Sequence, residues 1–373
     1  EANTTADSNT AVGAFSLTAN TTGGENTAVG RDSLKSNTTG AENTAVGYLA
    51  LSANTTADAN TAFGVQSLMV NTTGSLNASF GAASLDANTT GSNNTAMGYG
   101  SLTGNTTASN NTAFGYAALQ ENTTGTQNTA VGAGAADTTT TANNVTAFGF
   151  AAAGLGTQAN QVTAIGSQSL YNNTGLDNTG VGYAALFNNT SGQNNVAIGN
   201  ALGANTTASN NTAVGHLSLG SNTTGTNNVA VGYTALNGNT TASQNVAVGR
   251  AMWSGTVTGG NNVSIGFDSG KVVSSGAGNV FIGKDAGDAT QSGSKNVAVG
   301  HKTNTAHDTI NSITIGDTIT GSDNEFRFGK ASNVVSNTFT SNASWTRTSD
   351  VHKKTNIEDD TLGLDFINDL RTV

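Results

Sequence analysis

A four-residue motif, Thr-Ala-Val-Gly or a near variant, recurs at an almost constant interval through most of this 373-residue chain. The interval is 17 residues, with three steps of 16. The 19 glycines that close the motif are Gly13, Gly30, Gly47, Gly64, Gly81, Gly98, Gly115, Gly132, Gly149, Gly166, Gly182, Gly199, Gly215, Gly232, Gly249, Gly266, Gly283, Gly300 and Gly316. Such a period predicts a solenoid, because each repeat can form one coil that presents the same groups to both neighbouring coils.

The segment before each glycine is predicted to be a short strand, as in Asn43–Val46. Alternate side chains of a strand face opposite ways. We expect Val46 to line the core, and the small residue before it, Ala45, to face a partner chain. The apolar residues equivalent to Val46 include Val12, Val29, Phe63, Phe80, Met97, Phe114, Ile165, Ile198 and Ile282. The small residues equivalent to Ala45 include Ala11, Ala28, Ala113, Gly180, Ala230 and Ser264.

The remainder of each repeat carries a second apolar residue and a turn sequence. The motif glycine supplies either a positive φ or a close backbone approach. The second apolar anchors are Leu17, Leu34, Leu51, Leu68, Leu85, Leu102, Leu119, Leu170, Leu186, Leu219, Leu236 and Trp253. Asn-Thr-Thr turns begin at Asn3, Asn20, Asn37, Asn54, Asn71, Asn88, Asn105, Asn122, Asn205, Asn222 and Asn239. Each coil is thus expected to hold two strands and two turns, with stacked asparagines hydrogen-bonded as a ladder.

Composition favours an assembly of several such chains. Apolar residues make up 35% and there is no proline, which suits a continuous ladder of strands. Two large apolar anchors per repeat form a thin core, and association would cover the alanine face. The predicted fold class is all-β: a parallel β-solenoid or β-roll of 17-residue repeats, homotrimeric, with a short C-terminal helix. At one strand spacing per repeat, the coils would span roughly 90 Å.

Charge and sequence motifs exclude several classes of function. The net charge of −10 argues against a nucleic-acid partner, and no apolar run predicts membrane insertion. No cofactor or metal site is predicted, because His216, His301, His307 and His352 are dispersed. No site for catalysis on an external substrate can be argued. Two weaker alternatives are an ion held by Asp317 and Asp323, and Trp253 stacking on a sugar in place of filling the core.

Charged residues divide the chain into unlike parts. Residues 1–300 carry 19 of them and residues 301–373 carry 17. We therefore expect a solenoid shaft over 1–300, a transition β segment over 301–348, and a C-terminal module beginning at 349. Within that module, Leu362, Phe366, Ile367 and Leu370 share one helical stripe, which predicts the short helix.

Two resemblances add to this interpretation. The Asn-Thr-Ala-Val-Gly unit resembles the head repeat of trimeric autotransporter adhesins, which implies a trimeric parallel β-roll. The stretch Trp345–Ile357 is similar to the start of the self-cleaving intramolecular chaperone of phage tail fibres and tailspikes. That resemblance implies that Ser349 is the nucleophile of a self-cleavage and that Lys354 is its base, since a serine hydroxyl needs a base to activate it. Lys354 could act so only if burial lowers its pKa.

These observations lead to one main functional hypothesis and two rivals. The main one is a structural fibre protein, a component of a phage tail fibre or tailspike, whose trimerisation is assisted by the C-terminal chaperone module. It would project a surface that attaches to a host cell-surface glycan or protein, and would be located in the virion tail or on an extracellular surface. The first rival is a trimeric adhesin of a bacterial surface. The second is an ice-binding solenoid that uses the Asn-Thr-Thr rows.

Overall fold

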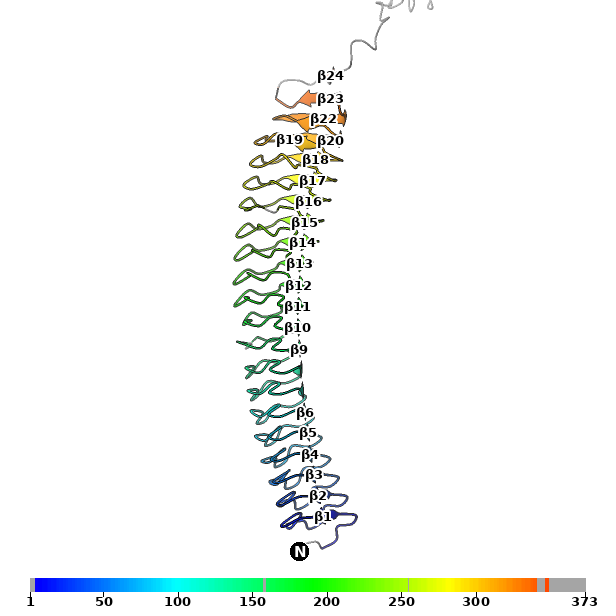
Figure 1. Ribbon diagram of the computed structural model, residues 1–373, viewed down its shortest axis with the longest axis vertical. Coiled ribbons are helices and arrows are strands. Elements are labelled where there is room, and N and C mark those ends of the chain that lie inside the picture. The colour runs from blue at the N-terminus through cyan, green and yellow to red at the C-terminus, as the bar shows by residue number, and fades with distance from the viewer. Residues whose placement is uncertain (1–3, 157–158, 254, 341–345, 349–373) are drawn as a thin grey trace, which may run out of the picture.

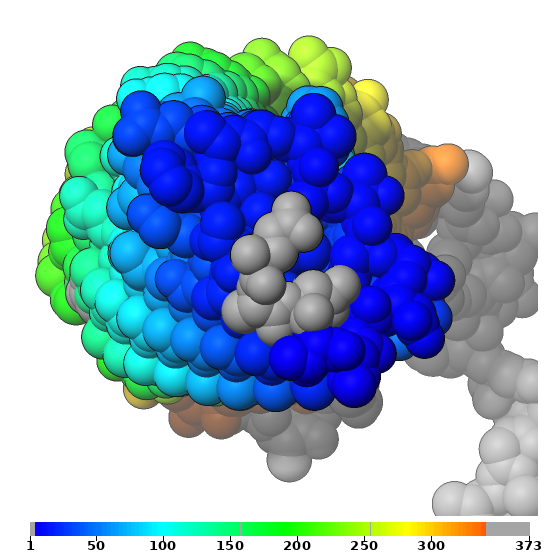
Figure 2. Space-filling view, turned by 90° about the horizontal axis from the view of Figure 1, so that it is seen from below, coloured from blue at the N-terminus to red at the C-terminus, as the bar shows by residue number. Residues whose placement is uncertain are grey.

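The computed structural model describes residues 4–156, 159–253, 255–340 and 346–348. These residues form a long, gently curved rod of stacked coils, with β1 (Thr10–Val12) at one end and β23 (Asn333–Thr338) near the other (Figure 1). Figure 2 looks along the rod from the N-terminal end, where the later coils emerge around the first because the rod curves. The predicted parallel β-solenoid with a repeat of about 17 residues is confirmed.

Each coil contributes one short strand to a sheet that runs along the rod. The three-residue strands are β1, β2 (Thr27–Val29), β3 (Thr44–Val46), β4 (Thr61–Phe63), β5 (Ala78–Phe80), β6 (Thr95–Met97), β7 (Thr112–Phe114), β8 (Thr129–Val131), β9 (Thr146–Phe148), β10 (Thr163–Ile165), β11 (Thr179–Val181), β12 (Val196–Ile198), β13 (Thr212–Val214), β14 (Val229–Val231), β15 (Val246–Val248), β16 (Val263–Ile265), β17 (Val280–Ile282) and β18 (Val297–Val299). Consecutive strands pair in parallel and in register, so that Ala45 faces Ala28 on one side and Ala62 on the other. Every column of equivalent residues therefore runs along the rod.

The sheet changes character at its C-terminal end. The last strands are β19 (Asn304–Thr305), β20 (Ile313–Asp317), β21 (Thr320–Gly321), β22 (Glu325–Lys330), β23 and β24 (Thr346–Thr348). The parallel order continues from β18 through β20 to β22. β23 then pairs with β22 in the antiparallel sense, as β24 does with β23. No helix occurs among the residues described, and the predicted helix around Leu362 to Leu370 lies outside them.

The expectation of two strands per coil is wrong. In the coil of Gly47, the residues after the strand form tight turns in which Leu49, Leu51 and Ala59 adopt φ values of 58°, 52° and 56°. Backbone hydrogen bonds to the next coil continue, for example from Leu51 N to Ser67 O at 3.0 Å. The left-handed residues break the alternation of side chains, because a strand needs a run of extended backbone.

Both roles predicted for the motif glycine occur together. Gly47 has a φ of 136°, and a Cβ there would lie 2.4 Å from the carbonyl oxygen of Gly64 in the next coil. A side chain is therefore excluded by conformation and by space alike.

The predicted orientation of the strand is inverted. Ala45 is fully buried inside the coil with Leu51, whereas Val46 lies on the outer face. The small residues expected to meet a partner are buried, apart from Ala11 in the terminal coil. The coil is narrow, and one leucine already fills the space opposite the strand, so that only a small side chain fits between them. The leucine anchors and Trp253 do line the core, as predicted; Leu17 is partly buried.

Three coils near the C-terminal end show that the volume inside the coil, between the strand and the leucine position, is limited. Trp253 takes the place of leucine, is fully buried, and donates from Nε1 to Ser264 Oγ at 3.0 Å. In the next two coils the leucine position is Gly270 and then Gly287, and Phe281 occupies the strand position of the alanine. A Cβ at Gly270 would lie 2.3 Å from Trp253, and one at Gly287 would lie 2.4 Å from Phe281. Larger and smaller residues thus compensate within a fixed volume.

Two columns of buried asparagines connect the coils, as the repeat predicts. In the turn column, Asn54 Nδ2 donates to Asn37 Oδ1 at 2.8 Å and to Ala57 O at 3.0 Å. In the column before the strands, Asn43 N donates to Asn26 Oδ1 at 3.0 Å. The side chain of Asn43 also donates to Ala57 O, so that one carbonyl joins both ladders. Polar groups this deeply buried must be paired, and the pairing requires equal spacing of the coils.

We expect Asn71→Ala to lower the free energy of unfolding by about 3 kcal/mol, since it removes three buried hydrogen bonds at roughly 1 kcal/mol or more each. Asn71 Nδ2 donates to Asn54 Oδ1 and Gly74 O, and its Oδ1 accepts from Asn88 Nδ2. Urea unfolding followed by circular dichroism measures the loss. The exposed neighbour Thr73 supplies the control: Thr73→Ala should change stability by less than about 0.5 kcal/mol. Equal losses in both variants would contradict the structural role of the ladder.

Candidate interaction surfaces

An uninterrupted row of apolar side chains runs along the outer face of the sheet. We call it the apolar stripe; it consists of Val12, Val29, Val46, Phe63, Phe80, Met97, Phe114, Val131, Phe148, Ile165, Val181, Ile198, Val214, Val231, Val248, Ile265, Ile282, Val299, Ile315 and Phe328. All are exposed or half-buried in the single chain; Phe63 is 55% exposed and Phe148 is 57% exposed. Contiguous apolar surface of this extent marks an interaction site.

A second outward column widens the stripe toward the C-terminal end. It consists of the first residue of each strand, because the first and third residues share one face. This residue is threonine from β1 to β11 in all strands but β5, where it is Ala78. From β12 on, the equivalent residues of the parallel sheet are apolar except for Thr212: they are Val196, Val229, Val246, Val263, Val280, Val297, Ile313 and Phe326, the second residue of β22, which pairs in register with Ile313. Neither column contains a charged residue.

A column of aromatic and basic side chains follows the motif glycines by one position. We call it the ring column; its aromatic and basic members are Arg31, Tyr48, Tyr99, Tyr116, Phe150, Tyr183, His216, Tyr233, Arg250, Phe267, Lys284 and His301, all exposed, and other residues occupy the column in the remaining coils. Where two rings occupy successive coils they stack: the centroids of Tyr99 and Tyr116 are 5.8 Å apart, and the planes differ by 9°. His216 and Tyr233 stack at 5.7 Å. Stacking at one coil spacing means that the ring faces point along the rod.

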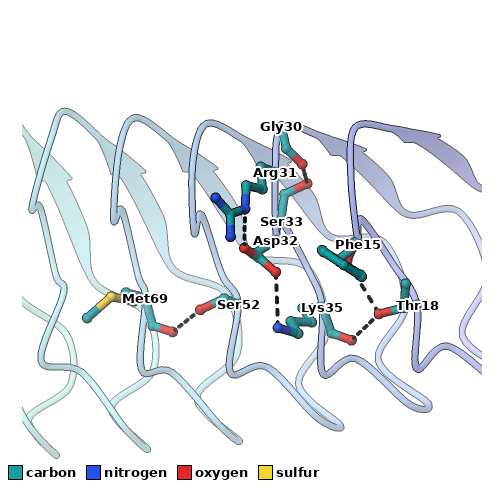
Figure 3. Close-up of polar contacts among 9 residues, drawn as sticks. All are labelled: Phe15, Thr18, Gly30, Arg31, Asp32, Ser33, Lys35, Ser52 and Met69. Atoms are coloured by element: carbon teal, nitrogen blue, oxygen red, sulfur yellow. Dashed lines mark hydrogen bonds and ion pairs between the residues drawn. The ribbon is translucent and has the colours of Figure 1, made fainter.

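The N-terminal end of this column carries the best-formed charge cluster. Asp32 is nearly buried and pairs with Arg31 Nε at 3.1 Å and with Lys35 Nζ at 3.0 Å (Figure 3). The guanidinium of Arg31 lies 5.8 Å above the ring of Tyr48, and Lys35 Nζ lies 5.5 Å from that of Phe15. Each of the three charged and two aromatic residues of this cluster contacts another member, which makes the cluster a structural element of the first coils.

The ring column has a gap between Tyr116 and Phe150, where the intervening residue is Ala133. A cavity of about 310 Å³ opens there, which we call the ring slot. Its lining residues are Tyr116, Ala117, Gln120, Ala133, Gly134, Asp137, Phe150, Ala151, Gly154 and Tyr171. The two aromatic walls are 63% and 62% exposed. The slot combines the aromatic side chains of Tyr116, Phe150 and Tyr171 with the amide of Gln120 and the carboxylate of Asp137.

Asp137 at the slot is a half-buried carboxylate whose Oδ1 has no hydrogen-bond partner among the described residues. Burial raises the pKa of Asp137 above its ordinary value, and the negative charge of Glu121 adds to the increase. Asp86, three coils earlier in the same column, also has an unpartnered Oδ1 and a pKa raised by burial. No aromatic residue flanks Asp86 in that column, since its neighbours there are Met69 and Thr103.

The candidate residues from the sequence are dispersed. Ser349 and Lys354, predicted to carry out self-cleavage, lie outside the described residues, as does His352. His301 Nδ1 lies 2.9 Å from Asp317 Oδ1, and this hydrogen bond, with one from Thr318, lowers the pKa of Asp317. Asp323 instead accepts a hydrogen bond from Ile310 N. The described residues include no group of three or more His, Cys, Asp or Glu side chains that could hold a metal ion.

The threonine rows of the Asn-Thr-Thr turns differ in how their hydroxyls are used. The first threonine of each turn donates to the next coil, as when Thr38 Oγ1 donates to Thr55 O at 2.9 Å. The second threonine, such as Thr39, is exposed. One of the two hydroxyl rows is therefore part of the structure of the coil. The ice-binding alternative stays a prediction, which a thermal hysteresis measurement tests.

No known family model matches this chain, and no curated protein is significantly similar to it. The residues described include no helix with the length and hydrophobicity needed to span a membrane. The function is therefore inferred from the apolar stripe, the ring column and the ring slot. Sequence reasoning missed the ring column and the slot, although the aromatic residues that follow the motif glycines are visible in the repeat.

We expect Asp86→Asn to raise the thermal unfolding midpoint at pH 7 and to leave it unchanged at pH 3. A raised pKa means that the folded state disfavours the ionised carboxylate. The ionised carboxylate of Asp86 therefore destabilises the fold fully at pH values well above its pKa in the folded state, and this effect is absent at pH values below its ordinary pKa of 3.8. Thermal melts at the two pH values measure the difference. Asp317→Asn is the opposite case, because its lowered pKa stabilises the fold at pH 7. A gain for Asp317→Asn at pH 7 would contradict the assignment.

Proposed function

We propose that this chain is the shaft of a homotrimeric fibre that projects a host-attachment surface, as a component of a phage tail fibre or tailspike. The observation that supports this most directly is the apolar stripe on a rod-shaped solenoid. A soluble single chain would expose this row along its whole length, which is unfavourable because apolar surface is driven out of water. In a fibre of several chains, the neighbouring chains would cover the apolar stripe and remove it from water.

Periodicity favours a second copy of the same chain as the partner. Side chains of the stripe recur at the coil spacing, roughly 4.7–4.9 Å, over about 19 coils. A partner that buries all of them must present apolar groups at the same spacing. An identical rod meets this condition throughout, because it has the same coil spacing along its whole length, and most soluble oligomers are closed assemblies of identical chains. The partner surface is therefore the apolar stripe, and not the alanine column, which lies inside the coil.

The width of the outer face favours three chains over two. The sheet presents two outward columns, the first and the third residues of the strands. Around a threefold axis each column meets a different neighbour, so both are covered by the same symmetry. From β12 on both columns are apolar except for Thr212, and the association would be tightest in this half.

Attachment is the role that suits such a shaft. A rod of roughly 90 Å holds its ends and sides away from the structure that carries it. The partner on the host would be a cell-surface glycan or protein, and the location would be the virion tail or an extracellular surface. A bacterial trimeric adhesin would use the same rod and stripe, and the genes that flank the coding sequence distinguish the two.

Light scattering coupled to size-exclusion chromatography should give three times the mass of one chain. We expect the double variant Phe114→Asp, Phe148→Asp to elute as a single chain, because two carboxylates per chain would be desolvated in the interface without partners. The matched control is Thr107→Asp, Thr124→Asp, which places the same charges on the second threonine of two Asn-Thr-Thr turns, where both side chains are exposed. The control should remain trimeric. A wild-type chain that is a stable monomer would refute the proposal.

The C-terminal self-cleavage is tested separately. If Ser349 is the nucleophile and Lys354 its base, intact mass spectrometry of the purified chain should show cleavage beside Ser349. Ser349→Ala and Lys354→Ala should both give the uncleaved mass, because the hydroxyl and its base act as a unit. Lys353→Ala, one residue away, should be cleaved like the wild type. Uncleaved wild-type chain, or cleavage that persists in Ser349→Ala, would contradict the assigned roles.

A further inference from the structure

We propose that the ring slot binds one neutral six-membered sugar ring, held between Tyr116 and Phe150, as the contact with a host glycan. The inference rests on the proposed attachment function and names the class of ligand. The ring column shows elsewhere how rings fill it, since neighbouring aromatic residues stack directly on each other. At Ala133 one ring is missing from this stack, and the cavity lies there.

The spacing of the walls fits a sugar ring. Tyr116 stacks on Tyr99 on one side, which leaves its other face directed toward the slot. Tyr116 and Phe150 are two coils apart, so their backbones are separated by roughly 9–10 Å. A flat ring in contact with both walls would need only about 7–8 Å, at 3.5–4.0 Å per contact. A puckered pyranose, with C–H groups on both faces, is thicker and fills the remaining space.

The floor and rim of the slot supply the polar contacts. Gly134 in the floor has no side chain, and a Cβ added there would meet only Asp137 Oδ2, at 3.7 Å. The carboxylate of Asp137 lines the slot and can accept a hydrogen bond from a sugar hydroxyl. Gln120 lies in the preceding coil of the same column, and its amide can both donate and accept. A few placed polar groups beside apolar walls are what a small-ligand site requires.

The charges around the slot select a neutral sugar. Asp137 lies in the slot, and the negative charge of Glu121 is close enough to raise the pKa of Asp137. The chain as a whole carries a net charge of −10. A uronic or sialic acid would add a further negative charge to this environment, whereas a neutral hexose donates hydroxyl protons to it. A hydroxyl that donates to the Asp137 carboxylate also offsets part of its desolvation.

The proposal is tested on the full chain by saturation-transfer NMR with the methyl glycosides of glucose, galactose, mannose and N-acetylglucosamine. Methyl glucuronide serves as the anionic comparison. We expect weak binding of at least one neutral glycoside. The decisive variant is Ala133→Tyr, which completes the ring column, as tyrosine does in several other coils, and should abolish binding while the fold is kept. Phe150→Ala, which removes one wall, should weaken binding about tenfold.

Two matched controls separate the slot from general effects. Ala82→Tyr makes the same substitution at the same repeat position, in a coil outside the slot, and should bind like the wild type. Asp86→Asn should also leave binding unchanged, whereas Asp137→Asn should reduce it. The inference is overturned if no neutral glycoside binds, if Ala133→Tyr binds like the wild type, or if the glucuronide binds more tightly.

The slot and the attachment function fail in distinguishable ways. If cells adsorb the wild-type and Ala133→Tyr fibres equally, attachment stands and the slot is not its receptor contact. If Ala133→Tyr loses glycoside binding but no cell adsorbs the wild-type fibre, the slot stands and the attachment function is wrong. Light scattering on each variant confirms that neither result comes from a change in the oligomeric state.

Discussion

The hydrogen bonds between buried asparagines are the constraint on which the solenoid depends. Each amide of the turn column donates to its counterpart one coil away, as between Asn54 and Asn37, and also closes the turn of its own coil. An unpaired buried amide is costly, and its partner is available only when the next coil has the same shape and lies in register. The ladders therefore enforce the repeat: a coil that differs in length or conformation leaves its neighbours unsatisfied. This explains how a chain with few large apolar residues holds one conformation.

The ladders also show what happens where the repeat is broken. Thr139 stands where the next asparagine after Asn122 would be, and both Asn122 Oδ1 and Thr139 Oγ1 lack partners among the described residues. The ladder resumes at Asn173. It ends again after Asn239, which pairs in the next coil with the backbone of Val257. The C-terminal end of each ladder, at Asn122 and at Asn239, leaves one amide oxygen unpaired, so a continuous ladder is more stable than the same number of asparagines in short pieces.

The sequence predicted the architecture but inverted the strand. A period of 17 residues and the alternation of side chains were enough to predict stacked coils with one small and one large column. They could not decide which column faces inward, because both are uninterrupted and both are uncharged. The width of the coil determines which column faces inward, and the sequence pattern does not contain this width. Leu51 fills that width, which leaves room for Ala45 but not for Val46. Phe281 faces inward only because glycine replaces leucine in two coils.

A solenoid of identical coils can offer only identical surfaces, so a unique site must come from departures from the repeat. Several departures coincide in the coils of Gly132 and Gly149. Alanine replaces the core leucine at Ala136 and Ala153, and buried valine replaces the asparagine before the strand at Val145 and Val162. These valines restore apolar volume next to the smaller core residues, which offsets part of the lost packing. Both of these coils contribute to the ring slot, together with Tyr116 from the coil before them and Tyr171 from the coil after them. The regular repeat thus fixes the distance between the walls, and the proposed binding site forms where Ala133, beside the Asp137 carboxylate, stands between two rings.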